Sequence, residues 1–120
     1  MGDMTEHFSR SEFACRCGCG RADVDLRLVS RLEMVRRVLD RPMVITSGAR
    51  CPEWNRAVGG KPNSAHLQGT AADIQCERSL ERFELVREAL AAGFRRVGIA
   101  RDFVHLDLAD DLPQPRLWLY

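Results

Sequence analysis

The pattern of apolar and polar positions predicts two long helices. From about residue 26 to 39 apolar residues recur every three or four positions, which is the spacing of one face of an amphipathic helix. Asp25 suits its start and Pro42 prevents its continuation. A second helix is predicted from Ser79, as its cap, to about Ala92. Its inward residues would be Phe83, Val86, Ala89 and Leu90.

Shorter apolar runs between these helices predict strands at 43–46, 71–76, 96–100 and 103–108, with an edge strand at 117–120. Two short helical pieces are expected, one near 10–14 after the S-x-x-E pattern of Ser9 and Glu12, and one from Pro52 to Gly59. Residues 61–70 are polar and predict a loop. This order of elements favours an α+β fold with a small, mainly antiparallel sheet and flanking helices.

Length and composition indicate one domain over residues 1–120, with an irregular, cysteine-rich segment at 1–22 packed on it. The net charge of +1 argues against a nucleic-acid partner. No apolar run approaches the ~20 residues that cross a bilayer, so no membrane insertion is expected. The first residues have neither the basic nor the apolar part of a secretory signal, so we expect synthesis in the cytoplasm. We expect a monomer.

The five cysteines leave three interpretations open. Cys15, Cys17 and Cys19 lie close together, while Cys51 and Cys76 are distant. The cluster could hold a structural metal with one of the distant cysteines, although C-x-C-x-C is not the usual C-x-x-C spacing of zinc sites. It could form disulfides in an oxidising compartment, one of them to Cys51, or it could consist of reduced thiols without function.

Candidate metal ligands lie in two stretches. His66 and Asp73 are seven residues apart, so the chain must double back if both bind one ion, and Gly69 permits this. In a strand over 103–108, His105 and Asp107 share one face with Phe103. These stretches supply a set of two imidazoles and one carboxylate, namely His66, Asp73 and His105. Three protein ligands and one water are typical of catalytic zinc.

Three further residues complete a hypothetical catalytic site. Asp102 could accept a proton from the zinc-bound water, provided that it sits in the turn before the strand. Arg50 follows a predicted strand and could stabilise an oxyanion or hold a substrate carboxylate. Asp107 would orient a ligand histidine or Arg50.

Four motifs in order carry a family resemblance: S-G-x-R at 47–50, N-x-x-V-G-G at 55–60, S-x-H-x-x-G-x-A-x-D at 64–73 and D-x-x-H-x-D at 102–107. Together they resemble the M15 family of zinc D-alanyl-D-alanine peptidases, and within it subfamily A. The resemblance implies the hedgehog/DD-peptidase fold and one catalytic zinc ion held by His66, Asp73 and His105. It implies Asp102 as general base and Arg50 as the residue that polarises the scissile carbonyl.

The resemblance further implies that the substrate is a peptidoglycan stem peptide, with Ser64 and Arg50 on the substrate side. Trp118 is a further candidate for contact with the substrate, with core packing as an equal interpretation. D-Ala-D-Ala carboxypeptidase activity is expected first, and endopeptidase cleavage is the alternative. Some members carry a second histidine where this chain has Phe103. A catalytic domain without a leader fits an enzyme of phage or prophage origin that acts at the bacterial cell wall or in the periplasm.

Two hypotheses from other classes remain. The chain could be a zinc-bearing cell-wall-binding or virion module without turnover, because a family member can lose its activity and keep its fold. It could also be a cysteine-rich redox or metal-sensing domain. Chelator-sensitive cleavage of muropeptides would distinguish the enzyme from both.

Overall fold

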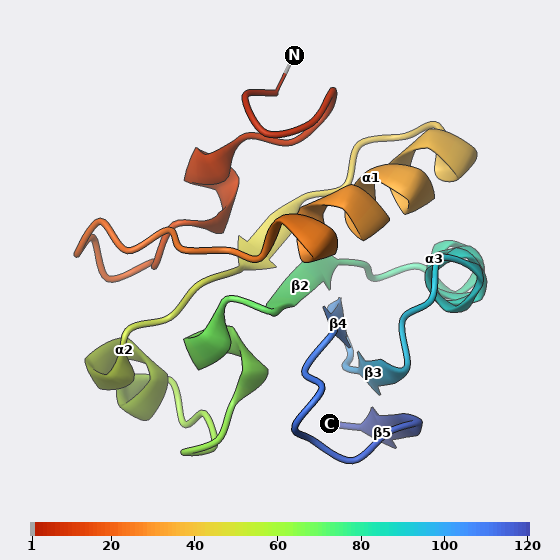
Figure 1. The fold of residues 1–120 in the computed structure, drawn as a ribbon. Helices are drawn as coiled ribbons and strands as arrows, with labels where there is room; N and C mark the ends of the chain where they lie inside the picture. Colours follow the sequence, from red (N-terminus) through yellow and green to blue (C-terminus); the bar gives the residue numbers. More distant parts are fainter. Residues whose placement is uncertain (1) are drawn as a thin grey trace.

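The computed structural model describes residues 2–120 as an α+β fold of short elements (Figure 1). The helices are α1 (Leu26–Leu39), α2 (Pro52–Ala57) and α3 (Ser79–Ala91), with 3-10 helices η1 (Arg10–Phe13) and η2 (Ala65–Gln68). The strands are β1 (Ile45–Ser47), β2 (Ala71–Gln75), β3 (Arg96–Ile99), β4 (Phe103–Asp107) and β5 (Arg116–Leu119).

The five strands form one sheet in the order β1-β2-β4-β3-β5. The pairs β1–β2, β2–β4 and β3–β4 are antiparallel, and only β5 runs parallel to its neighbour β3. The predicted α+β class, the mainly antiparallel sheet and the terminal edge strand are therefore confirmed.

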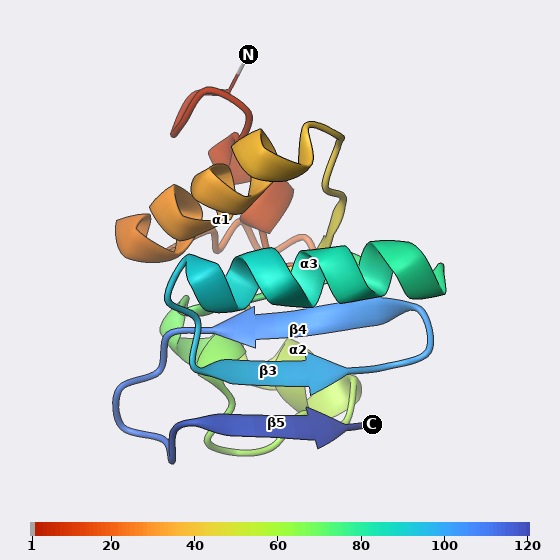
Figure 2. The same cartoon turned by 90° about the vertical axis from the view of Figure 1, so that its right-hand side faces the viewer.

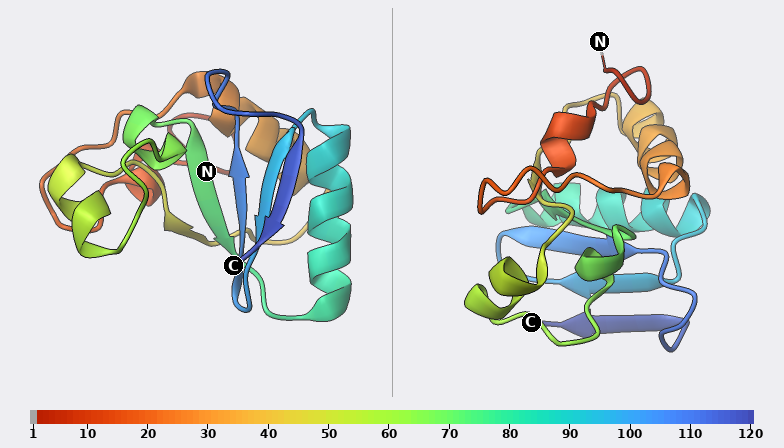
Figure 3. Two further views of the ribbon diagram at one scale, coloured as in Figure 1. Left: turned by 90° about the horizontal axis from the view of Figure 1, so that it is seen from below. Right: turned by 60° about the vertical axis from the view of Figure 1, so that its left-hand side comes forward.

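Helices cover both faces of the sheet. Figure 2 shows β4, β3 and β5 side by side, with α3 in front of them and α2 behind. Figure 3 shows that α1 lies on the same side of the sheet as α3, whereas α2 and the η2 segment lie on the opposite side. The sheet thus has one face for the main core and another face available for a site.

Alternation along the central strands separates these two faces. Ile74 on β2, with Val104 and Leu106 on β4, joins the core beneath α1 and α3. Phe8 and Phe13 of the N-terminal segment are fully buried in the same core. Asp73 and His105 are Cα partners in the β2–β4 ladder and face the other way, so the register itself brings two polar side chains together.

The bounds of α1 agree with the prediction, and Asp25 caps the helix by accepting a hydrogen bond from the Arg27 N–H at 2.8 Å. The prediction for the inward face of α3 was partly wrong. Phe83 and Leu90 are exposed, while Leu85 and Ala89 are buried. Ala89 is therefore buried as predicted, and the buried stripe is rotated toward Leu85 relative to the predicted one.

Two other predictions need correction. The predicted loop at 61–70 contains η2, and the N-cap of α3 is Arg78 rather than Ser79. Within residues 2–120, none of the helices has both the length and the apolar character needed to span a lipid bilayer.

Candidate metal centre

Three elements deliver the predicted ligands to one point on the sheet face that lies opposite the main core. His66 lies on η2, Asp73 on β2 and His105 on β4. Gly69 ends η2 in a left-handed conformation with φ 72°, where a side chain would also collide with the Asp23 carbonyl oxygen. This turn reverses the chain between His66 and Asp73, as the sequence predicted.

The distances fit a shared metal ion. His105 Nδ1 lies 2.9 Å from Asp73 Oδ1, and His66 Nε2 lies 3.3 Å from the same oxygen. One nitrogen of each imidazole and one carboxylate oxygen lie within 4.8 Å of one another, and all three residues are buried. Within residues 2–120, no fourth His, Cys, Asp or Glu joins this group. Three protein donors of this kind are the ligand set of a catalytic zinc site with one open position.

The outer nitrogens of the two imidazoles are held in the way that metal-binding histidines require. His66 Nδ1 lies 2.8 Å from the carbonyl oxygen of Gly48. A carbonyl can only accept, so Nδ1 carries the hydrogen, and in the neutral ring Nε2 then has a lone pair available for a metal ion. His105 Nε2 lies 2.7 Å from Asp107 Oδ2, which leaves Nδ1 for the ion. Both rings therefore present a donor atom to the same point.

Both carboxylate oxygens of Asp107 have hydrogen-bond partners. Its Oδ1 accepts hydrogen bonds from Arg96 Nε at 2.9 Å and from the Ala109 backbone N–H at 3.0 Å, and only 1% of the residue is exposed. A buried carboxylate with these partners is placed to orient His105 rather than to serve as a ligand itself.

The electrostatics of the centre favour bound positive charge. Burial alone would raise the pKa of Asp73, but the adjacent His105 and His66 side chains lower it well below the ordinary range. Burial alone would lower the pKa of His105, but its hydrogen bonds to Asp107 and Asp73 raise it. Asp73 is thus held as a carboxylate, the form that binds a cation.

Arg50 lies beside the centre with each part of its guanidinium occupied. Nε donates to Ser47 Oγ at 3.2 Å, one terminal nitrogen donates to Asn55 Oδ1 at 3.2 Å, and the other lies 3.6 Å from Asp73 Oδ2. The structure therefore brings Arg50 to the predicted ligands, on the side of Asp73 away from the histidines.

Asn55 is a site residue that the sequence reasoning quoted in a motif without assigning it a role. Its side chain is buried, and its Nδ2 donates to the Lys61 carbonyl oxygen at 2.9 Å. A Cβ at Gly60 would lie 2.1 Å from Asn55 Oδ1, so glycine is needed there to admit the amide. The N-x-x-V-G-G spacing was the available signal, because it places the glycine five positions after the asparagine, just beyond the end of α2.

The remaining predicted substrate residues have different surroundings. The Trp118 ring lies 5.4 Å from that of His105, and the Arg96 guanidinium lies 5.0 Å from the Trp118 ring centroid, so Trp118 borders the centre. Ser64 caps η2, and its Oγ accepts a hydrogen bond from the His66 N–H at 3.2 Å. The structure thus gives Ser64 a local role in placing His66.

The structure does not bring Asp102 to the centre. The residue sits in the turn before β4, as the hypothesis required, but its side chain is exposed. Its backbone oxygen accepts from the Cys76 N–H, three positions along the ladder from the Asp73–His105 pair. Three residues of strand correspond to about 10 Å. A general base must reach the proton that it removes, and this placement does not provide that reach.

The five cysteines are all free, and four of them form a separate cluster: Cys15, Cys17, Cys19 and Cys51. Cys76 is buried in the main core, apart from the cluster.

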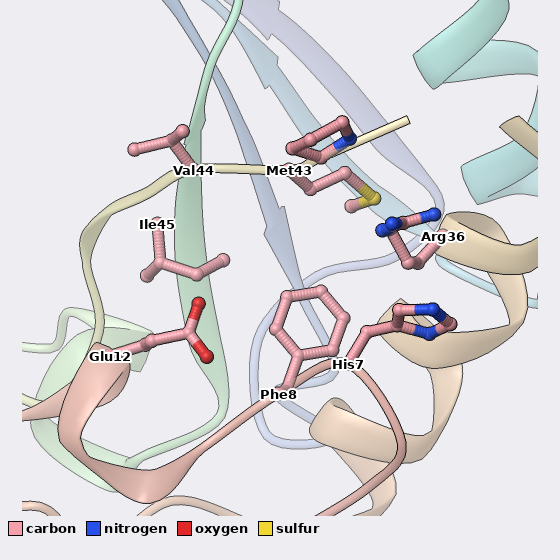
Figure 4. Close-up of a pocket in the computed structure, with 8 residues that line it drawn as sticks. His7, Phe8, Glu12, Arg36, Met43, Val44 and Ile45 are labelled. Carbon is pink, nitrogen blue, oxygen red and sulfur yellow. The ribbon is translucent and has the colours of Figure 1, made fainter. Parts of the chain in front are cut away.

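A cavity lies away from the metal centre. It has a volume of about 350 Å³ between the N-terminal segment, α1 and the chain entering β1, and Figure 4 shows His7, Arg36 and Met43 among the residues that line it. His7 Nδ1 lies 2.6 Å from Glu33 Oε2, which fastens this segment to α1. None of the three donors His66, Asp73 and His105 lines this cavity. The candidate chemistry is therefore assigned to the donor cluster on the sheet.

Comparison with known proteins agrees with this geometry. A family model described as Peptidase M15 matches residues 6–107, which include every donor of the centre and most of the chain. None of the curated proteins compared with the chain matches it.

Proposed function

Because the chain belongs to the M15 peptidase family, we propose that it is a zinc peptidase that hydrolyses peptide bonds in peptidoglycan stem peptides. The observation that carries the proposal is the donor set His66, Asp73 and His105, which converges on one point and is joined by no fourth protein ligand within residues 2–120. Zinc sites closed by four protein ligands are structural, whereas those with three are catalytic. The donor set therefore favours an enzyme over a binding module.

The residues present fit a zinc ion. His66 Nε2, Asp73 Oδ1 and His105 Nδ1 would hold it. When bound, zinc lowers the pKa of a coordinated water to about 7 and polarises a carbonyl group. Gly48 and Asp107 keep the two imidazoles in the tautomer and orientation that binding needs.

Arg50 supplies the positive charge for the substrate. Its guanidinium lies next to Asp73, so a peptide carbonyl at the centre would lie within its reach. A fixed guanidinium stabilises the negative charge that develops on that oxygen, because it needs little reorganisation during the reaction. It could equally hold the terminal carboxylate of a stem peptide. Trp118, next to His105, would form the wall against which the peptide lies.

We propose D-Ala-D-Ala carboxypeptidase activity as the specific reaction, within a hedgehog/DD-peptidase-type fold and at the bacterial cell wall. An arginine that is fixed beside the ligands suits a substrate that ends in a carboxylate. Endopeptidase cleavage within the stem peptide is the alternative outcome of the test. We no longer assign the base role to Asp102, because it is exposed and distant from the centre along β4.

The test is digestion of purified muropeptides, with the products identified by mass. We expect release of D-alanine by the wild-type protein, abolished by a chelator and restored by zinc. An Asp73→Asn variant should be inactive, while Glu53→Gln, on the exposed side of α2, should remain active. Separated stem fragments would show an endopeptidase. The absence of any chelator-sensitive product from several wall types would contradict the proposal.

A further inference from the structure

Four cysteine side chains meet at a point formed by two distant segments. Cys15, Cys17 and Cys19 lie between η1 and α1, and Cys51 is the N-cap of α2. The Sγ–Sγ distances are 3.5 Å for Cys15–Cys17, 3.8 Å for Cys15–Cys51 and 3.6 Å for Cys17–Cys51. The sulfur of Cys19 completes a group whose members all lie within 4.8 Å of one another.

These separations match a tetrahedron of sulfur atoms around one ion. A zinc–sulfur bond of about 2.3 Å places the sulfurs of a tetrahedral site about 3.8 Å apart. Disulfides join thiols in pairs and give no reason for all four sulfurs to approach a common centre. Since one sulfur comes from a segment 36 positions from Cys15, local C-x-C-x-C spacing does not explain the grouping either.

We propose that Cys15, Cys17, Cys19 and Cys51 bind a second zinc ion, which is structural. On binding, the four thiols release four protons and the four thiolates form bonds to the ion, so no redox change is needed. Four protein ligands leave no place for water, which distinguishes this site from the three-donor centre. The site does not depend on the proposed peptidase activity.

Backbone N–H groups already point at two of the sulfurs. The N–H of Cys51 donates to Cys15 Sγ at 3.4 Å, and the N–H of Trp54 donates to Cys51 Sγ at 3.4 Å. Such donors stabilise the negative charge of a metal-bound thiolate and orient its sulfur. The first turn of α2 thus serves as an outer layer for the site.

The ion would fasten the N-terminal segment to the chain that carries Arg50. The two segments are already joined by hydrogen bonds, from the Ala49 N–H to the Phe13 oxygen at 2.8 Å and from the Arg16 guanidinium to the Ile45 oxygen at 2.7 Å. Cys51 adds the third connection immediately after Arg50. The second zinc therefore stabilises the backbone from which Arg50 and α2 extend.

Metal analysis by mass spectrometry tests the proposal. We expect two zinc ions per chain in wild-type protein purified under reducing conditions with zinc. The Cys17→Ser/Cys19→Ser variant changes two exposed residues and should retain one, and Asp73→Asn should also retain one. Cys76→Ala, at the cysteine outside the cluster, should retain two. A single zinc in the wild type, unchanged in the double cysteine variant, would overturn the proposal.

A spectroscopic measurement on the wild type covers the case in which the double variant does not fold. Cobalt bound by four thiolates shows intense thiolate-to-metal charge-transfer absorption in the near ultraviolet, which histidine and carboxylate ligands do not give. We expect this absorption in cobalt-loaded wild type and in Asp73→Asn. Its absence from the folded, reduced wild type, or an intact mass that shows disulfides in zinc-loaded protein, would overturn the proposal. Neither result depends on muropeptide cleavage, so it can be separated from failure of the proposed function.

Discussion

At the scale of single residues, Arg50 shows how strongly a side chain can be positioned by its neighbours. We expect Arg50→Lys to lower kcat/KM by about 100-fold, because an ammonium group cannot replace the guanidinium contacts to Ser47, Asn55 and Asp73 at once. Steady-state kinetics on a muropeptide measures the effect. Arg56→Lys, on the exposed side of α2, is the matched control and should be unaffected. Equal losses in both variants would remove the specific role of Arg50.

Asp102 is expected to contribute little to catalysis. General acid–base groups contribute about 10²- to 10⁴-fold to a rate, so loss of a true base would be evident. Because its carboxylate is exposed and apart from the donor cluster, we expect Asp102→Asn to retain kcat within about tenfold, with an unchanged acidic limb of the pH–rate profile. A loss of 100-fold or more would return the base role to Asp102.

Sequence motifs indicated the donors but not the residues that hold them. The proposed ligand set could be named from the sequence, because His66 and Asp73 share one short motif and His105 stands in another. The Gly48 carbonyl and Arg96 were missed, since their importance arises from contacts across the fold, to His66 and Asp107. A backbone carbonyl has no sequence signature, and a strand arginine resembles any exposed cation.

At the scale of elements, the close packing of the C-terminal aromatic side chains against β3 depends on Gly98. A Cβ at Gly98 would lie 2.6 Å from Trp118 Nε1 and 2.8 Å from Tyr120 Cε2. We therefore expect Gly98→Ala to displace the aromatic side chains of the C-terminal strand and to lower the free energy of unfolding by about 1–3 kcal/mol, measured by urea denaturation.

The cause is tested by a double-mutant cycle. In a Trp118→Ala background the collision with the indole is gone, so Gly98→Ala should cost clearly less there than in the wild type. The same cost in both backgrounds would show that Trp118 is not the source of the strain.

Helices and strands were predictable where a periodic pattern was long, as in α1. They were less predictable where the packing of one element against another determines which residues are buried. The inward face of α3 depends on which of its stripes fits the sheet: Ala89 is buried as predicted, but Leu85 is buried in place of Phe83 and Leu90. The helix η2 escaped prediction because four residues are too few to show a period.

At the scale of the whole molecule, the N-terminal segment is fastened to α1 by a buried carboxylate. Burial alone would raise the pKa of Glu33, but hydrogen bonds from the His7 side chain and backbone N–H lower it to about 2. The lowered pKa stabilises the fold above about pH 4.5, and this stabilisation is lost as the pH falls through about 2.

We therefore expect the free energy of unfolding to decrease between about pH 4.5 and 2, with Glu33 contributing on the order of 3 kcal/mol. Denaturation at a series of pH values measures this. Glu33→Gln should flatten the dependence in that range, whereas Glu53→Gln, exposed on α2, should not. Identical profiles for wild type and Glu33→Gln would refute the contribution.

The arrangement of the whole chain could be predicted only in outline. Composition and element order indicated an α+β fold, but not that the N-terminal segment would supply Phe8 and Phe13 to the core. They left open whether its cysteines would meet Cys51 or Cys76, or neither. Such contacts join residues far apart in sequence, and one chain without a repeating pattern gives no signal for them.

The central claim is that His66, Asp73 and His105 hold one zinc ion. Anomalous diffraction from crystals of the zinc-loaded protein, recorded on both sides of the zinc absorption edge, tests it most directly. We predict a zinc peak bounded by His66 Nε2, Asp73 Oδ1 and His105 Nδ1, in contact with no other protein atom. A map from zinc-loaded crystals with no peak between these atoms, or a peak there with a fourth protein ligand, would contradict the account.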